Sequence, residues 1–74
     1  MQITTGKDIL AERKRRGIPA NGFCRLSGID RNVLRACESG GCLPTQDTID
    51  KALVLFELYD RKQQVAVRAL ADTV

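Results

Sequence analysis

Three side chains in one short segment are suited to hydrogen bonding with nucleotide bases. Arg31, Asn32 and Arg35 are spaced so that a helix would place them on one face, which Ala36 completes. An arginine can donate two hydrogen bonds to O6 and N7 of guanine, and an asparagine can pair with N6 and N7 of adenine. These residues are therefore candidates for contacting bases. The alternative is an exposed helix face that has no partner.

The segment that carries these side chains has helix signals at both ends. Asp30 can accept hydrogen bonds from the free amides of a first turn, and Gly40 and Gly41 provide a stop. We therefore expect a helix over about 31–39 that presents its polar face and packs through its apolar face. The apolar face consists of Val33, Leu34 and Cys37.

A helix over 19–27, ending at Gly28, is expected immediately before this segment. The short connection over 27–30 gives a helix-turn-helix pattern, in which the outer face of the second helix can enter a major groove. The buried residues expected in the 19–27 helix are Phe23 and Cys24, with Leu26 as a further candidate.

The first helix is expected to begin near Thr5, where Asp8 can complete a short capping box. It ends at Gly17, after a basic last turn that suits the negative end of the helix dipole. Ile9 and Leu10 supply its buried face.

A fourth helix is expected from Thr45, whose hydroxyl can cap it, to about Leu58 or Tyr59. It carries two apolar stripes and therefore needs a second partner surface. A polar break at 60–62 then precedes a fifth helix over about 65–74. The stripes consist of Ile49, Ala52, Leu53 and Phe56, and of Thr48, Ala52, Leu55 and Tyr59.

No stretch alternates apolar and polar residues as a strand would, so the expected fold class is all-α. We expect a compact domain of four to five helices, with residues 1–59 as its body and residues 60–74 as a C-terminal packing or dimerisation helix. The expected dimer or partner surface consists of Leu55, Leu58, Tyr59, Val67 and Leu70.

The charge is distributed unevenly along the 74 residues. The net charge of +3 arises from a basic segment over 1–44, whereas residues 45–74 are almost neutral. A basic front favours a polyanionic partner, with nucleic acid as the leading candidate and a solvated charged face as the alternative. The sequence lacks the apolar run of a membrane span and the pattern of a secretory signal, so we expect a cytoplasmic protein.

Catalytic and metal-binding chemistry are not indicated. The chain has no histidine and no glycine-rich phosphate loop, so we expect neither an enzyme nor a cofactor. Its three cysteines cannot supply a four-ligand zinc site or a complete set of disulfides within one chain, which favours a reducing compartment. Cys24 and Cys37 are interpreted as small buried apolar residues, and Cys42 as the loop thiol that could react.

Residues 7 to 57 resemble the lambda-repressor-like Xre/Cro family. The motifs in register with that family are Arg13-x-x-x-Gly17-Ile18, Cys24-x-x-x-Gly28-Ile29-Asp30-Arg31, Leu34-x-x-Cys37-Glu38-Ser39-Gly40 and Leu43-Pro44-Thr45-x-Asp47-Thr48-Ile49. The resemblance implies a helical DNA-binding domain that regulates transcription, usually as a dimer on an inverted repeat.

The resemblance also implies roles for individual residues. The recognition helix corresponds to residues 30–39, with Arg31, Asn32, Arg35 and Ala36 facing bases. Arg13 and Glu38 correspond to an ion pair that the family often forms, which makes them structural. The residues expected to contact phosphate are Asn21, Arg15, Arg16, Gly41 and Thr45.

The chain departs from the family at two places. The family commonly begins its second helix with Ser or Thr followed by Gln, where this chain has Pro19-Ala20-Asn21. Either Asn21 takes over the cap or the phosphate contact, or the helix begins later. The family also often has Lys or Arg after the recognition helix, where this chain has Gly41 and Cys42. A phosphate contact there would come from backbone amides or from the start of the fourth helix.

These observations favour a sequence-specific regulator of transcription, most simply a repressor. A dimer would place its recognition helices in successive major grooves of double-stranded DNA, at half-sites about 34 Å apart. The alternative is an antagonist on the same scaffold, an antiactivator or antitoxin, that captures another protein through its surplus apolar surface.

Overall fold

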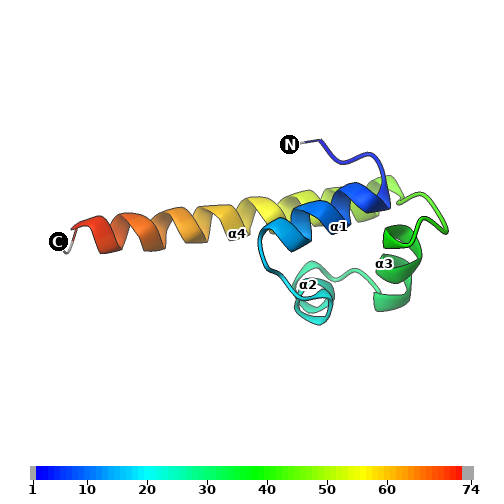
Figure 1. Ribbon diagram of the computed structural model, residues 1–74, viewed down its shortest axis with the longest axis horizontal. Coiled ribbons are helices and arrows are strands. Elements are labelled where there is room, and N and C mark those ends of the chain that lie inside the picture. The colour runs from blue at the N-terminus through cyan, green and yellow to red at the C-terminus, as the bar shows by residue number, and fades with distance from the viewer. Residues whose placement is uncertain (1, 73–74) are drawn as a thin grey trace.

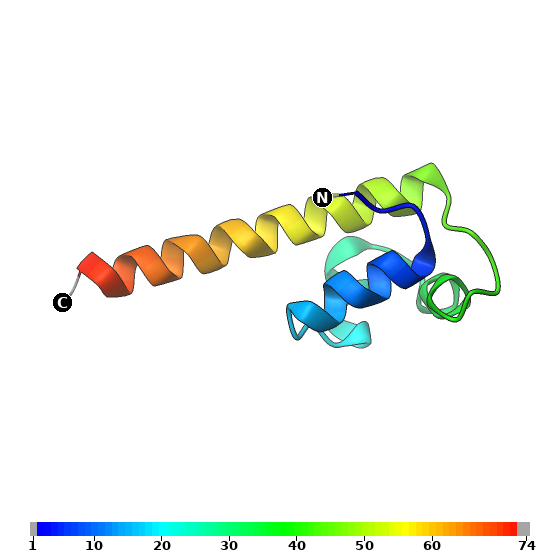
Figure 2. The ribbon, with the colours of Figure 1, turned by 45° about the horizontal axis from the view of Figure 1, so that its top comes forward.

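The computed structural model describes the backbone of residues 2–72 and the side chains of residues 2–63. Within this range the chain is all-helical. Its four helices are α1 (Gly6–Arg15), α2 (Ala20–Ser27), α3 (Arg31–Glu38) and α4 (Gln46–Asp72). Three short helices gather on the N-terminal half of α4, and the rest of α4 extends past them (Figures 1 and 2). No helix in this range is long and apolar enough to cross a membrane.

The expected break at 60–62 does not occur, and the predicted fifth helix is instead the continuation of α4. The helix has no glycine or proline to interrupt it over its 27 residues. Glu57 and Arg61, one turn apart, form an ion pair of 2.9 Å across the expected boundary. Asp60 pairs with α1, as described below. The side chains of Val67 and Leu70 lie outside the described residues.

The core forms where α1 and α2 meet the first half of α4 and where α3 packs against α1 and α2. Phe23 of α2 and Phe56 of α4 are fully buried, with ring centroids 5.4 Å apart. Ile9 of α1 and Leu34 of α3 complete the centre of this cluster. Complete burial of such a side chain contributes about 1.5–3 kcal/mol, so these residues supply much of the stability of a small domain.

Local signals at the start of α1 and α4 act as the sequence predicts. Thr5 and Asp8 form the capping box, and the amides of Thr4 and Thr5 lower the pKa of Asp8 by donating to its carboxylate. The hydroxyl of Thr45 accepts a hydrogen bond from the amide of Thr48 at 3.2 Å. These short-range interactions fix where the helices begin.

The start of α1 packs directly on the end of α3. A Cβ atom at Gly6 would collide with the backbone carbonyl of Cys37, so only glycine allows this approach. The contact places the N-terminal turn of α1 beside the C-terminal turn of α3.

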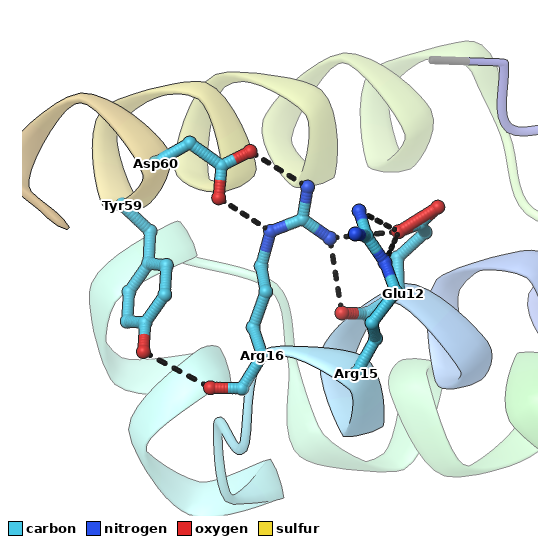
Figure 3. Close-up of polar contacts among 5 residues, drawn as sticks. All are labelled: Glu12, Arg15, Arg16, Tyr59 and Asp60. Atoms are coloured by element: carbon cyan, nitrogen blue, oxygen red, sulfur yellow. Dashed lines mark hydrogen bonds and ion pairs between the residues drawn. The ribbon is translucent and has the colours of Figure 1, made fainter. Parts of the chain in front are cut away.

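Arg16, at the end of α1, ties this helix to α4 (Figure 3). Its Nε and Nη2 atoms donate to the two carboxylate oxygens of Asp60 at 2.8 Å each, and its Nη1 donates to Glu12 Oε2 at 2.8 Å. The guanidinium lies 4.6 Å from the centre of the Phe56 ring. The hydroxyl of Tyr59 donates to the Arg16 carbonyl at 3.0 Å.

These contacts correct the prediction that Arg16 binds phosphate. Its side chain is only 5% exposed, and each guanidinium nitrogen donates to Glu12 or Asp60. A side chain held in this way would have to abandon two carboxylates to reach a phosphate. Arg16 is therefore a structural residue.

The Arg16 network should make stability depend on acid pH. Hydrogen bonds from Arg16 lower the pKa of Asp60 and of Glu12 below their ordinary values of 3.8 and 4.5. The folded chain therefore binds these protons less tightly than the unfolded chain does. The resulting stabilisation is complete above the ordinary values and is lost as pH falls through the lower, folded values. Asp60→Asn should reduce the Tm at about pH 7 and flatten its decline below about pH 4.

Thermal unfolding followed by circular dichroism over this pH range would measure the effect. Glu57→Gln is the matched control, because Glu57 forms an exposed pair with Arg61 that contributes little. An Asp60→Asn variant with the acid profile of the unsubstituted chain would contradict the assigned role of Asp60.

Candidate nucleic-acid interface

The helix α3 begins at a strong cap. The Asp30 carboxylate accepts hydrogen bonds from the amides of Asn32 at 2.8 Å and Val33 at 3.4 Å. Because Asp30 also precedes the helix in an extended conformation, α3 starts at Arg31. The sequence-predicted start of this helix is confirmed, and its end at Glu38 lies one residue before the expected one.

The inner face of α3 is narrower than the sequence suggests. Leu34 and Cys37 are buried as expected, but Val33 is 42% exposed. With 100° of rotation per residue, two buried positions three residues apart suffice for a helix of two turns, and Val33 falls on its flank. Leu26 of α2, a further candidate for burial, is 71% exposed, and Phe23 is the fully buried residue of this helix.

The outer face of α3 brings the predicted base-contacting residues together. Arg31, Asn32 and Arg35 are exposed, and Ala36 is half-buried at the edge of this face. Among the described residues, none of the three polar side chains forms a hydrogen bond or an ion pair with another residue. A shallow groove of about 310 Å³ adjoins this face, lined by Ala20, Arg31, Leu34, Arg35, Glu38 and Ser39.

The expected ion pair between Arg13 and Glu38 is present. Arg13 Nε and Nη2 donate to the two oxygens of Glu38 at 2.9 Å each, and Nη1 donates to the carbonyl of Ile18 at 3.0 Å. The two side chains are 12% and 11% exposed. This bidentate pair joins the end of α3 to α1 and to the turn that follows α1, so it holds the outer face of α3 in a fixed orientation.

Three predicted phosphate contacts lie on the surface in different settings. Asn21 is exposed in the first turn of α2, which begins at Ala20 after Pro19 and has no side-chain cap. Arg15 is exposed but pairs with Glu12 at 2.8 Å. The hydroxyl of Thr45 caps α4 through its bonds with Thr48. A phosphate contact at this position would therefore come from the backbone amides at the start of α4.

The predicted phosphate contact from the amide of Gly41 is wrong. That amide donates to the carbonyl of Ala36 at 2.9 Å, while the amide of Gly40 donates to Cys37 at 3.1 Å. Gly40 has a φ of 86°, so the two bonds form the glycine-terminated end of α3. Because closing the helix uses this amide, Gly41 has no free donor for a phosphate.

The same turn creates a pair of thiols that the sequence interpretation missed. Cys37 is 1% exposed, as expected, and Cys42 is exposed, but their Sγ atoms lie only 3.7 Å apart. Burial, and next the contact with Cys42, raise the pKa of Cys37. Burial also raises the pKa of Cys24, which is half-buried. The five-residue spacing across Gly40 and Gly41 is the signal that could have revealed the pair.

The Arg13–Glu38 pair can be tested by substitution. Arg13→Met or Glu38→Met alone should destabilise the fold by about 3 kcal/mol, because each leaves a poorly solvated charge without its partner. The double variant should cost clearly less than the sum of the two, since neither charge then remains. Urea denaturation would provide the three free energies of unfolding. Additive effects would contradict a coupled pair, and Arg61→Met on the exposed pair of α4 is the control.

Comparison of the chain with protein-family models, curated proteins and solved structures finds no match. What the interface binds must therefore be inferred from its own residues and their geometry.

Proposed function

We propose that this protein is a sequence-specific DNA-binding regulator of transcription. In this proposal α2 and α3 form a helix-turn-helix unit, and α3 is the recognition helix that enters the major groove. One observation carries the proposal. Arg31, Asn32 and Arg35 share an exposed face of a helix whose opposite side is fixed by the core and by the Arg13–Glu38 pair.

The side chains of this face favour contacts with bases over the alternative of a hydrated surface with no partner. Each arginine can donate two parallel hydrogen bonds to a guanine, and Asn32 can do the same with an adenine. A good bidentate contact discriminates between bases by about 1–3 kcal/mol. Such discrimination is favoured when the helix that carries the donors is held in place, which the part-buried Arg13–Glu38 pair supports.

Contacts with the DNA backbone would come from the margins of this face. The first turn of α2 has no side-chain cap, so its amides and the side chain of Asn21 can donate to a phosphate. Arg15 adds an exposed charge on α1. Since Arg16 and the Gly41 amide are engaged elsewhere, we expect fewer phosphate contacts than the sequence suggested and a correspondingly modest salt dependence.

A dimer would allow the recognition helices to read an inverted repeat. Val54 and Leu58 of α4 are exposed, and they line an apolar groove of about 240 Å³ together with Leu26 and Leu55. The helix α4 also extends past the body of the domain, where it can lie against a second copy. Repression follows most simply, because a dimer bound at a promoter would block access to it.

A protein-binding antagonist is the second candidate function. The observation that favours it is the amount of exposed apolar surface, which includes Leu26 at 71% and Leu43 at 76% exposure. Such a protein would use the groove between α2 and α4 to capture another regulator or a toxin. It would have no need for the unpartnered donors on α3, which is why DNA binding is the first candidate.

Selection from a randomised double-stranded DNA library would test the base-reading face. The unsubstituted chain should enrich a defined sequence and bind it with an affinity that decreases as salt rises. Arg31→Ala and Arg35→Ala should each weaken binding to that sequence by about 5-fold to 150-fold and relax one base position. Arg61→Ala removes the same charge from the distant part of α4 and should leave the preference unchanged. A library with no enriched sequence would favour the antagonist.

The dimer can be tested by the mass of the protein in solution. Leu58→Glu places a charge in the apolar groove and should yield monomers at concentrations where the unsubstituted chain is dimeric. Leu43→Glu, in the loop before α4, changes an equally accessible leucine outside that groove and should leave the mass unchanged. Sedimentation equilibrium would provide the masses. A dimer that persists in Leu58→Glu would exclude this groove as its interface.

A further inference from the structure

The two thiols at the end of α3 form a close pair with unequal access to solvent. Cys42 is exposed in the loop after α3, whereas Cys37 is 1% exposed and belongs to the core-facing side of the helix. Their Sγ atoms are 3.7 Å apart, compared with about 2 Å in a disulfide bond. A reagent in solution can therefore reach Cys42 directly, and the buried thiol of Cys37 lies next to the reacting sulfur.

The loop is the part that can close this distance. Cys37 is held by the helix, by the core and by the approach of Gly6 to its carbonyl. The amides of Gly40 and Gly41 are bonded to α3, but among the described residues the amide of Cys42 has no backbone partner, and its side chain is exposed. Closing the remaining distance between the two sulfur atoms therefore requires movement of Cys42 and its loop rather than of Cys37.

The surroundings of Cys42 suit a small anionic reagent. A pocket of about 500 Å³ lies between the start of α1 and this loop, and both cysteines line it. Lys7 lines the same pocket, and the end of its side chain reaches the loop at Gly40. Peptide disulfides such as glutathione disulfide carry carboxylates, so the charge of Lys7 favours their approach to Cys42.

We propose that Cys37 and Cys42 are a reversible dithiol that small anionic disulfides oxidise to an intramolecular disulfide. The Cys42 thiolate attacks one sulfur of the reagent, forms a mixed disulfide and displaces one thiolate. Cys37 then loses its proton and attacks Cys42 Sγ, which displaces the second thiolate. Two electrons pass to the reagent, which leaves as two thiols after taking up the two cysteine protons.

The raised pKa of Cys37 is consistent with this order of events. Burial, reinforced by the contact with Cys42, keeps Cys37 protonated, so the exposed Cys42 reacts first and Cys37 resolves the mixed disulfide. The dithiol does not depend on the proposed function. Only its consequence does: if α3 reads DNA, ring closure would pull on the turn that ends the recognition helix and weaken binding.

The test uses the full chain and glutathione disulfide, followed by acid quenching, alkylation and mass spectrometry. The expected product is a monomer that has lost two hydrogen atoms, with Cys37 and Cys42 joined and Cys24 alkylated, and reduced glutathione should reverse it. Cys24→Ser should form the same ring. Cys42→Ser, a change at an exposed position that should not disturb folding, should form no intramolecular disulfide.

Three outcomes would overturn the proposal. They are a glutathione adduct on Cys42 that never proceeds to the ring, a disulfide between two chains as the main product, and a ring that includes Cys24. Each can be read from the masses of the intact protein and its peptides. None depends on whether the chain binds DNA, so a failure of the proposed function leaves this result interpretable.

Discussion

A single guanidinium group fixes the geometry on which the candidate interface depends. Arg13 donates to both oxygens of Glu38 and to the carbonyl of Ile18, so one side chain joins α1, the turn after it and the end of α3. The pair is almost excluded from water, where its attraction is strong but its desolvation is costly. Its main contribution is therefore to the orientation of α3 relative to α1. Another orientation would leave Arg13 or Glu38 without its partner.

The arginines of the N-terminal half fall into two groups, one paired inside the fold and one exposed. Arg13 and Arg16 are directed inward and are satisfied by carboxylates of other segments. Arg31 and Arg35 are directed outward and have no partner among the described residues. The net charge alone would treat these four residues alike, yet only the outward pair can meet a polyanion. Lys14 and Arg25 are exposed as well, so the outward-facing positive charge of this half extends beyond α3.

The C-terminal turn of α3 contains residues of both the ion pair and the thiol pair. It carries Glu38 for the ion pair and Cys37 for the thiol pair, and Gly40 closes it. The ion pair, the two thiols and the end of α3 therefore lie within a few residues of one another. Such proximity is what a switch acting on the proposed recognition helix would require.

Short-range signals in the chain were enough to predict where α1, α3 and α4 begin. The caps at Thr5, Asp30 and Thr45 act within four residues of the chain, so their spacing was enough to predict them. The candidate base-reading face was predictable for the same reason, since helical periodicity is a local property. The pair between Arg13 and Glu38 was expected only from a family resemblance.

Burial and side-chain pairing depend on which residues the packing of the helices places opposite one another. In the sequence Asp60 belongs to a polar stretch, but in the structure it pairs with Arg16. Leu26, a candidate core residue in the sequence, is exposed in the structure. The proximity of Cys37 and Cys42 likewise depends on how the chain turns after α3. A one-dimensional pattern records which side chains are apolar or charged, but burial and pairing are set by the partner that packing supplies.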